Sequence, residues 1–151
     1  MLEEQNKILL VEDNEEDVEL TLHALRHECI INKIQVARDG EEALDLLFGT
    51  GSHAGQTPYE LPRLILLDLK LPKVNGIEVL KKIKSDERTK ATPVVILTSS
   101  KEDRDLVESY GSGANSYIQK PVDFEQFRSV VRQAGLYWLL INQSPLPARA
   151  A

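Results

Sequence analysis

Five residues of this chain have side chains suited to phosphoryl chemistry, and each follows a short apolar run. They are Glu12 and Asp13 after residues 8–11, Asp68 after residues 64–67, Thr98 after residues 94–97 and Lys120 after residues 117–119. Near-continuous apolar runs of this length are typical of strands buried on both faces of a parallel sheet. Ligands of such sheets bind beyond the carboxyl ends of the strands, so we expect these side chains to meet at one edge.

Three carboxylates gathered in one small site repel one another, and a cation relieves that repulsion. A divalent ion that prefers oxygen ligands, such as Mg²⁺, suits Glu12, Asp13 and Asp68. The ammonium of Lys120 adds a positive charge for an oxyanion, and Thr98 adds a hydroxyl donor. Because a carboxylate beside such a metal can accept a phosphoryl group, the residue types predict phosphoryl transfer to Asp68.

The apolar runs alternate with segments of helical period, which is the pattern of successive βα units. A fifth run, residues 33–37, alternates apolar and polar residues and is expected to be a more exposed strand. Helix starts are predicted at Asn14, which precedes an acidic turn, and at Ser100 and Asp123, which resemble the starts of capping boxes. These elements predict an α/β protein with a parallel sheet covered by helices.

Length and composition fit one domain over residues 1–151, with an ordered core over about residues 6–141 and a flexible tail over 142–151. The loop from Gly49 to Pro62 is unusually long and is expected to lie on the surface. A net charge of −6 disfavours nucleic acid as a partner. No apolar stretch is long enough to span a membrane, and the N-terminus does not resemble a signal peptide. With a single cysteine, Cys29, the composition indicates a cytoplasmic protein.

In this order, the motifs of the chain resemble the receiver domain of two-component response regulators over about residues 6–134. The resemblance is carried by Glu12-Asp13, Asp68 in LILLDLKLPKVNG, Thr98-Ser99 in VVILTSS, Tyr117 in NSYIQKP and Lys120-Pro121. It implies a flavodoxin-like, doubly wound fold with a five-stranded parallel sheet. It also implies that Asp68 accepts a phosphoryl group from a sensor histidine kinase, and that the protein is a signalling phosphoacceptor rather than an enzyme. Such a protein assists only its own phosphorylation and dephosphorylation.

The resemblance also implies a metal site. Glu12, Asp13, Asp68 and the backbone carbonyl of Lys70 would hold Mg²⁺. The first acidic position holds Glu12 where the family more often has aspartate, which preserves the charge but lengthens the reach.

Further roles follow from the same resemblance. Thr98 and Lys120 would grip the phosphoryl group, and Tyr117 would be the aromatic switch that reorients with Thr98. The Lys120–Pro121 peptide bond would be cis, a minority state for bonds that precede proline.

A narrower resemblance links the chain to the small response regulators paired with bacterial and cyanobacterial phytochromes. It is carried by the loop before YELPRLILLDLKLPKVNG, the segment KPVDFEQF and the helix end YWLL. Some members of that group form dimers. We therefore consider a homodimer through the fourth helix, fifth strand and fifth helix, or through the apolar Tyr137–Trp138 region.

Two other classes of function compete with this interpretation. The first is a degenerate receiver that acts only as a protein-binding module, which an absence of Mg²⁺ binding would favour. The second is an enzyme or flavin carrier on the same fold. A flavin carrier needs a phosphate-binding loop after the first strand, but the acidic segment from Glu12 to Glu16 occupies that place.

Overall fold

Five parallel strands form one sheet in the order β2-β1-β3-β4-β5. This computed structural model describes residues 7–27, 33–51 and 61–143. The strands are β1 (Lys7–Val11), β2 (Lys33–Ala37), β3 (Leu64–Leu67), β4 (Val94–Thr98) and β5 (Ser116–Gln119). The strand order reverses direction between β1 and β3, which is the point where ligands of doubly wound sheets bind. The predicted five-stranded, flavodoxin-like fold is confirmed.

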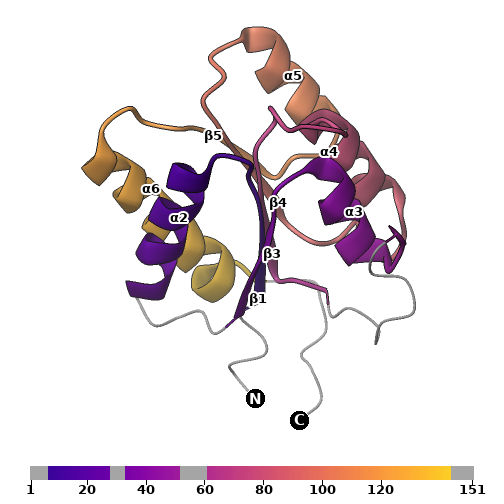
Figure 1. The fold of residues 1–151 in the computed structure, drawn as a ribbon, viewed down its shortest axis with the longest axis horizontal. Coiled ribbons are helices and arrows are strands. Elements are labelled where there is room, and N and C mark those ends of the chain that lie inside the picture. Colours follow the sequence, from indigo (N-terminus) through magenta and orange to yellow (C-terminus); the bar gives the residue numbers. More distant parts are fainter. Residues whose placement is uncertain (1–6, 28–32, 52–60, 144–151) are drawn as a thin grey trace.

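Helices cover both faces of this sheet (Figure 1). They are α2 (Glu15–His27), α3 (Gly40–Phe48), α4 (Gly76–Ser85), α5 (Asp103–Gly111) and α6 (Phe124–Leu136), which continues into the π-helical turn η2 (Tyr137–Ile141). Figure 1 shows α2 and α6 side by side on one face, with α3, α4 and α5 on the other. None of these helices is both long and apolar enough to cross a membrane, within the part of the chain that the structure describes.

Alternate residues of the central strands enter two separate apolar clusters. In β1, Leu9 and Val11 pack with the α3 and α4 side, whereas Ile8 and Leu10 pack with the α2 and α6 side. All four side chains are at most 2% exposed. Because both faces of β1 are covered, its apolar run shows no alternation, as expected for a parallel sheet. Strand β2 is the more exposed one that the sequence predicts.

Side-chain caps fix where several helices begin. Asn14 accepts a hydrogen bond from the Asp17 amide, and Asp123 accepts one from the Gln126 amide, as predicted. The predicted cap at Ser100 is wrong, because α5 begins at Asp103 and has no side-chain cap. The Ser100 hydroxyl instead donates to the Asp105 carboxylate, in the first turn of the helix.

Several sequence predictions fall on other parts of the chain. Cys29, residues 52–60 of the long loop and residues 144–151 of the tail lie outside the described residues. At the start of the loop, Gly49 ends α3 in the left-handed conformation, with a φ of 66°. A residue with a β-carbon is disfavoured there, so a glycine suits this helix end.

Candidate functional site

The candidate site lies at the carboxyl ends of β1, β3, β4 and β5. The Asp68 amide donates to the Val11 carbonyl over 3.0 Å, and the Lys120 amide donates to the Thr98 carbonyl over 2.7 Å. These bonds extend the ladders of the sheet by one residue beyond the strands. They therefore place the side chains of neighbouring strand ends at one edge, as the apolar runs predict.

Gly76 sets the path of the chain just after Asp68. A β-carbon built on Gly76 would lie 2.3 Å from the Asp68 carbonyl oxygen and 2.5 Å from the Leu69 α-carbon. The Gly76 amide donates to the Leu69 carbonyl over 2.9 Å. Only glycine allows this close approach of two backbones, so the start of α4 braces the segment that carries Asp68.

Three carboxylates form a group that could hold a metal ion. Ligand oxygens of Glu12, Asp13 and Asp68 all lie within 4.8 Å of one another. Glu12 and Asp68 are buried, whereas Asp13 is exposed. Oxygen donors at this spacing, open to solvent on one side, fit a Mg²⁺ ion that keeps some of its water. Lys70, the fourth predicted ligand, donates its amide to Asp68 Oδ1 over 3.4 Å, and the role of its carbonyl stays a prediction.

Lys120 lies against this cluster and contacts three carboxylates. Its Nζ atom is 2.6 Å from Glu12 Oε1, 2.8 Å from Asp17 Oδ2 and 3.1 Å from Asp68 Oδ2. Burial by itself lowers the pKa of a lysine, but the Asp68 charge and the bonds to Asp17 and Glu12 outweigh it and hold the pKa of Lys120 above its usual value. The ammonium is therefore charged at neutral pH and can attract an oxyanion.

The carboxyl group of Glu12 is destabilised in its charged form. Burial first, and then the neighbouring Asp68 carboxylate, raise the pKa of Glu12 to about 7, although Lys120 opposes the shift. A carboxylate held this far from its preferred ionisation is a mark of functional sites. A bound cation would relieve the repulsion.

Thr98 and Tyr117 belong to a second group of contacts, centred on Ser100. Thr98 is fully buried, and its hydroxyl accepts a hydrogen bond from the Ser100 amide over 3.3 Å. The Tyr117 hydroxyl donates to the Ser100 carbonyl over 3.3 Å. Burial raises the pKa of Tyr117, so it is a neutral donor at physiological pH. Their predicted switch roles stay predictions.

One predicted feature of this segment is wrong. The described residues contain no cis peptide bond, so the bond between Lys120 and Pro121 is trans here. The trans form of a bond before proline is favoured by about 0.5–1 kcal/mol.

Two contacts of the site were not predicted from the sequence. Asp17 lies one helical turn beyond Asp13 and reaches Lys120 from α2. Asp105 reaches back from α5 to Ser100. Asp17 belongs to the acidic first turn of α2, which the sequence explains as a favourable interaction with the helix dipole. The sequence carries no sign that one of its carboxylates turns toward Lys120.

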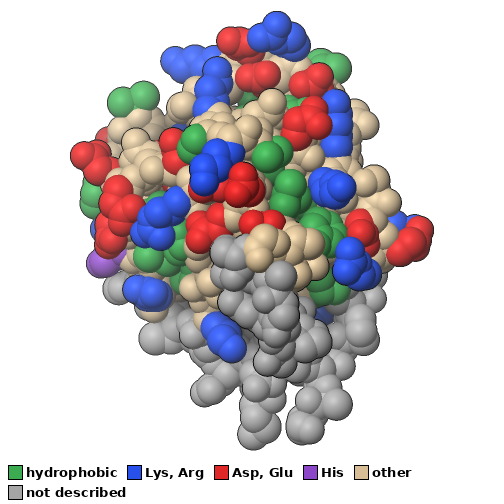
Figure 2. Space-filling view, turned by 45° about the vertical axis from the view of Figure 1, so that its right-hand side comes forward, with side chains coloured by type: hydrophobic (Ala, Val, Ile, Leu, Met, Phe, Trp, Pro, Cys, Tyr) green, Lys and Arg blue, Asp and Glu red, His purple; other side chains and the backbone are tan. Residues whose placement is uncertain are grey.

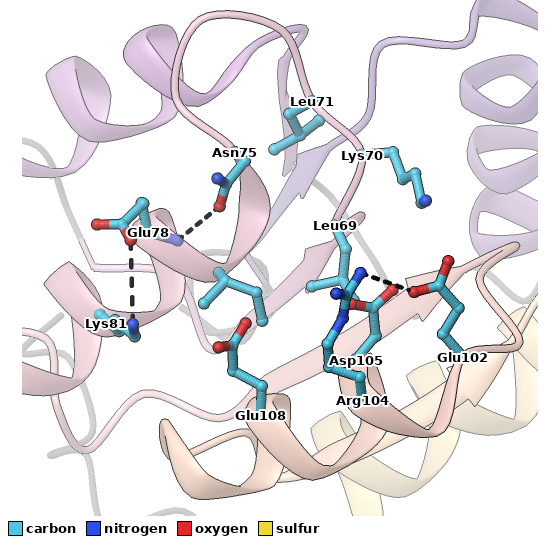
Figure 3. Close-up of a pocket in the computed structure, with 11 residues that line it drawn as sticks. Leu69, Lys70, Leu71, Asn75, Glu78, Lys81, Glu102, Arg104, Asp105 and Glu108 are labelled. Carbon is cyan, nitrogen blue, oxygen red and sulfur yellow. Dashed lines mark hydrogen bonds and ion pairs between the residues drawn. The ribbon is translucent and has the colours of Figure 1, made fainter.

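Asp105 also lines a groove of about 570 Å³ between α4 and α5. Figure 3 shows its labelled side chains, among them Leu69, Lys81, Arg104 and Glu108. The Arg104 guanidinium pairs with Glu102 and the Lys81 ammonium with Glu78. Four of the charged side chains that line the groove are thus paired with each other, and a fifth, Asp105, is bonded to Ser100 beyond the end of β4.

The fold and the site define a class of protein: a doubly wound domain with an acidic cluster and a lysine at the edge of its sheet. The response regulator receiver domain family matches residues 8–132 of the chain. This protein therefore belongs to the response regulator receiver family.

Within this family, the chain is similar to several individual response regulators. The chain is 46% identical over 141 residues to the probable methanogenesis regulatory protein FilR2 of Methanothrix harundinacea, covering 93% of this chain and 88% of FilR2. Its fold superposes on the phosphorylated cyanobacterial phytochrome response regulator RcpA with a TM-score of 0.86 and 39% identity, covering 94% of this chain and 99% of RcpA. The Mn²⁺-bound form of response regulator Rcp1 gives a TM-score of 0.85 and 35% identity, covering 93% and 99%. The predicted resemblance to phytochrome-associated response regulators is confirmed.

Proposed function

We propose that this protein is a phosphoacceptor of a two-component system and that Asp68 receives the phosphoryl group. The observation that carries the proposal is the contact of Lys120 Nζ with Asp68 Oδ2 over 3.1 Å, inside a cluster of oxygen ligands. One carboxylate, one ammonium and a metal-binding pair are the parts that a phosphoryl acceptor needs. That RcpA was crystallised in a phosphorylated form supports the same chemistry here.

The transfer replaces one bond to phosphorus by another. A carboxylate oxygen of Asp68 attacks the phosphorus of a phosphohistidine, the P–N bond breaks, and its electron pair stays on the imidazole nitrogen. Lys120 donates to a phosphoryl oxygen at the place where it now donates to Asp68. The buried Thr98 hydroxyl, next to the site on β4, donates to another phosphoryl oxygen. Catalysis of this kind rests on positioning and charge neutralisation.

Glu12, Asp13 and Asp68 would hold Mg²⁺ in this proposal, with the Lys70 carbonyl as a further ligand. The metal would neutralise charge that develops on the phosphoryl group. Rcp1, a relative at 35% identity, binds Mn²⁺, which prefers similar oxygen ligands.

The signal leaves the site through the surface of the protein. A phosphoryl group on Asp68 would draw Thr98 toward it and disturb the contacts of Ser100 with Asp105 and Tyr117. This would bias the position of α5, so the switch roles of Thr98 and Tyr117 are part of the proposal.

The partners follow from the same reasoning. We expect a sensor histidine kinase as phosphoryl donor, and the similarity to RcpA suggests a phytochrome kinase. Because such a kinase uses ATP, we also expect a cytoplasmic location. Exposed apolar side chains offer two surfaces for a homodimer: Leu106, Val107 and Tyr110 on α5, and Tyr137, Leu140 and Ile141 at η2. Figure 2 shows acidic and basic side chains interspersed on one face, which together with the net charge of −6 does not favour nucleic acid.

The test is the intact mass of the protein after incubation with acetyl phosphate and Mg²⁺. We expect one phosphate adduct on the native chain. It should not form when EDTA is present during the incubation, and it should be absent from Asp68→Asn. Asp103→Asn is the matched control, because it removes the same charge from the first turn of α5, away from the acidic cluster. An adduct that persists in Asp68→Asn would contradict the proposal. A native chain that folds but binds no Mg²⁺ and takes no phosphate would favour the degenerate, binding-only receiver.

A further inference from the structure

Among the described carboxylates near the site, Asp17 contacts Lys120 but is explained neither by the metal cluster nor by the phosphoacceptor role. It is not among the oxygens that lie within 4.8 Å of one another. Nevertheless, its Oδ2 atom lies 2.8 Å from Lys120 Nζ, whereas the Oδ2 atom of Asp68 lies 3.1 Å from the same nitrogen. Its side chain is 25% exposed, compared with 3% for Glu12 and 8% for Asp68. Asp17 therefore sits at the rim of the site, between Lys120 and solvent.

The three contacts use the full donor capacity of Lys120. A lysine ammonium has three N–H donors and no acceptor. Glu12 and Asp17 take the two shorter bonds, at 2.6 and 2.8 Å, from the end of β1 and the start of α2. The third and longest bond, at 3.1 Å, goes to Asp68 at the end of β3. Because the donors diverge from one nitrogen, fixing two of them directs the third.

Asp17 is itself held firmly. Its amide donates to Asn14 Oδ1 over 3.0 Å, in the capped first turn of α2. That helix packs against α6, the helix that follows Lys120 in the chain. The contact between Asp17 and Lys120 thus links the first turn of α2 to the segment that leads into α6, directly beside the site.

We propose that Asp17 is a positioning residue for Lys120: together with Glu12 it occupies two N–H groups of the ammonium, so that the third points at the phosphoacceptor oxygen of Asp68. This inference rests on the proposed function for its effect on phosphorylation. When phosphate arrives, only the Asp68 bond has to be exchanged for one to a phosphoryl oxygen, while the Asp17 bond stays. A charged hydrogen bond directed in this way is preorganised for the transition state.

A purely electrostatic role for Asp17 and a positioning role predict opposite changes in the rate of phosphorylation when Asp17 is removed. Its negative charge would repel an anionic phosphodonor, so removing it would speed phosphorylation. Positioning predicts that Asp17→Ala slows phosphorylation, with Asp17→Asn between native and alanine because the amide oxygen remains a weaker acceptor.

The first experiment measures the rate constant of phosphorylation by acetyl phosphate at saturating Mg²⁺, followed by intact mass. We expect the maximal rate constant to fall about tenfold in Asp17→Ala, with the half-saturating Mg²⁺ concentration unchanged. The matched control is Glu16→Ala, which removes an equal charge from the same exposed turn and should stay within about twofold of native. A native or higher rate in Asp17→Ala would overturn the proposal.

A double-mutant cycle shows whether Asp17 acts through Lys120. In a Lys120→Ala background, Asp17→Ala should cause no further loss of rate. An equal loss in both backgrounds would mean that Asp17 acts by another route, and would overturn the proposal.

The second experiment needs no phosphorylation. Reductive methylation of lysines, mapped by mass spectrometry, reports how freely the Lys120 amine reacts; its side chain is now 7% exposed. We expect Lys120 to react several-fold faster in Asp17→Ala than in the native protein or Glu16→Ala. Unchanged labelling would overturn the positioning role. If the native chain takes no phosphate, the proposed function fails, and the labelling still decides whether Asp17 holds Lys120.

Discussion

Two groups of polar contacts extend from the edge of the sheet that holds Asp68, and they differ in charge. The Lys120 network joins Lys120 to Glu12, Asp17 and Asp68, and it ties β1, α2 and β3 to the end of β5. The Ser100 network joins Ser100 to Thr98, Asp105 and Tyr117, and it ties β4 and β5 to α5. The first is built from buried charges, whereas the second rests mainly on longer contacts with backbone atoms.

The helices behind the two networks differ in the same sense. Helix α6 buries Phe127, Val131, Ala134 and Gly135. Helix α5, all of which the structure describes, buries only Ser109, whose hydroxyl finds no hydrogen-bond partner in the described part of the protein. Apolar burial is the main source of stability, and an unpaired buried hydroxyl costs free energy.

The difference separates the tasks of the molecule. In the proposed function, the Lys120 network and α6 would hold the reacting groups in place, which phosphoryl transfer requires. The Ser100 network and α5 are weakly anchored, so they can change position for a small cost in free energy. The following predictions test this contrast, from the largest effect to the smallest.

Truncation of one apolar side chain in α6 should lower the free energy of unfolding much more than a truncation in α5. Phe127 in α6 is 4% exposed, so Phe127→Ala should lower the free energy of unfolding by about 3–5 kcal/mol. Leu106 in α5 is 37% exposed, and Leu106→Ala should cost less than about 1 kcal/mol. Urea denaturation measures both. Equal losses would show that α5 is anchored as firmly as α6.

Because the charged form of Glu12 is unfavourable in the folded protein, replacing this residue by a neutral one should stabilise the fold. The native state raises the pKa of Glu12 from 4.5 to about 7, so the protonated form is favoured there and stability falls as the pH rises through this range. We expect Glu12→Gln to raise the free energy of unfolding by ~1–3 kcal/mol at pH 8 in EDTA, and by much less at pH 5.

Thermal or urea unfolding at the two pH values measures this effect. Glu16→Gln, on the exposed first turn of α2, is the control and should change little at either pH. A gain that does not depend on pH would mean that the Glu12 charge is not its source. The same variant should bind Mg²⁺ more weakly, because it replaces a carboxylate ligand by an amide.

Removing the Ser100 hydroxyl should loosen α5 without unfolding the protein. Ser100→Ala deletes the bond to Asp105, which is worth about 1 kcal/mol. Amide hydrogen exchange should then become roughly fivefold faster in α5 and stay unchanged in α6. The control is Ser129→Ala in α6, which deletes a hydroxyl that accepts from Gln133. Faster exchange throughout both helices would argue against a separately mobile α5.

The smallest effect on stability is expected for Tyr117→Phe. The lost bond to the Ser100 carbonyl is 3.3 Å long, so the free energy of unfolding should change by less than about 0.5 kcal/mol. If Tyr117 couples the site to α5, the difference in α5 hydrogen exchange between phosphorylated and unphosphorylated protein should shrink. An undiminished difference would remove Tyr117 from the proposed switch.

The sequence alone was sufficient for the strands and for the main groups of the site. The apolar runs before Glu12, Asp68 and Thr98 are buried on both faces, and that requirement defines a parallel sheet whose carboxyl ends meet. Once the sheet is known, the approach of Glu12, Asp13, Asp68 and Lys120 follows from topology.

Only the tertiary structure decided the partners on the flanking helices. Asp17 is one of three acids in the first turn of α2, and Asp105 is one of two in that of α5. Local sequence gives each of these turns the same explanation, a favourable interaction with the helix dipole. Which acid reaches Lys120 or Ser100 depends on how each helix is rotated against the sheet, and that rotation is set by packing between residues far apart in the chain.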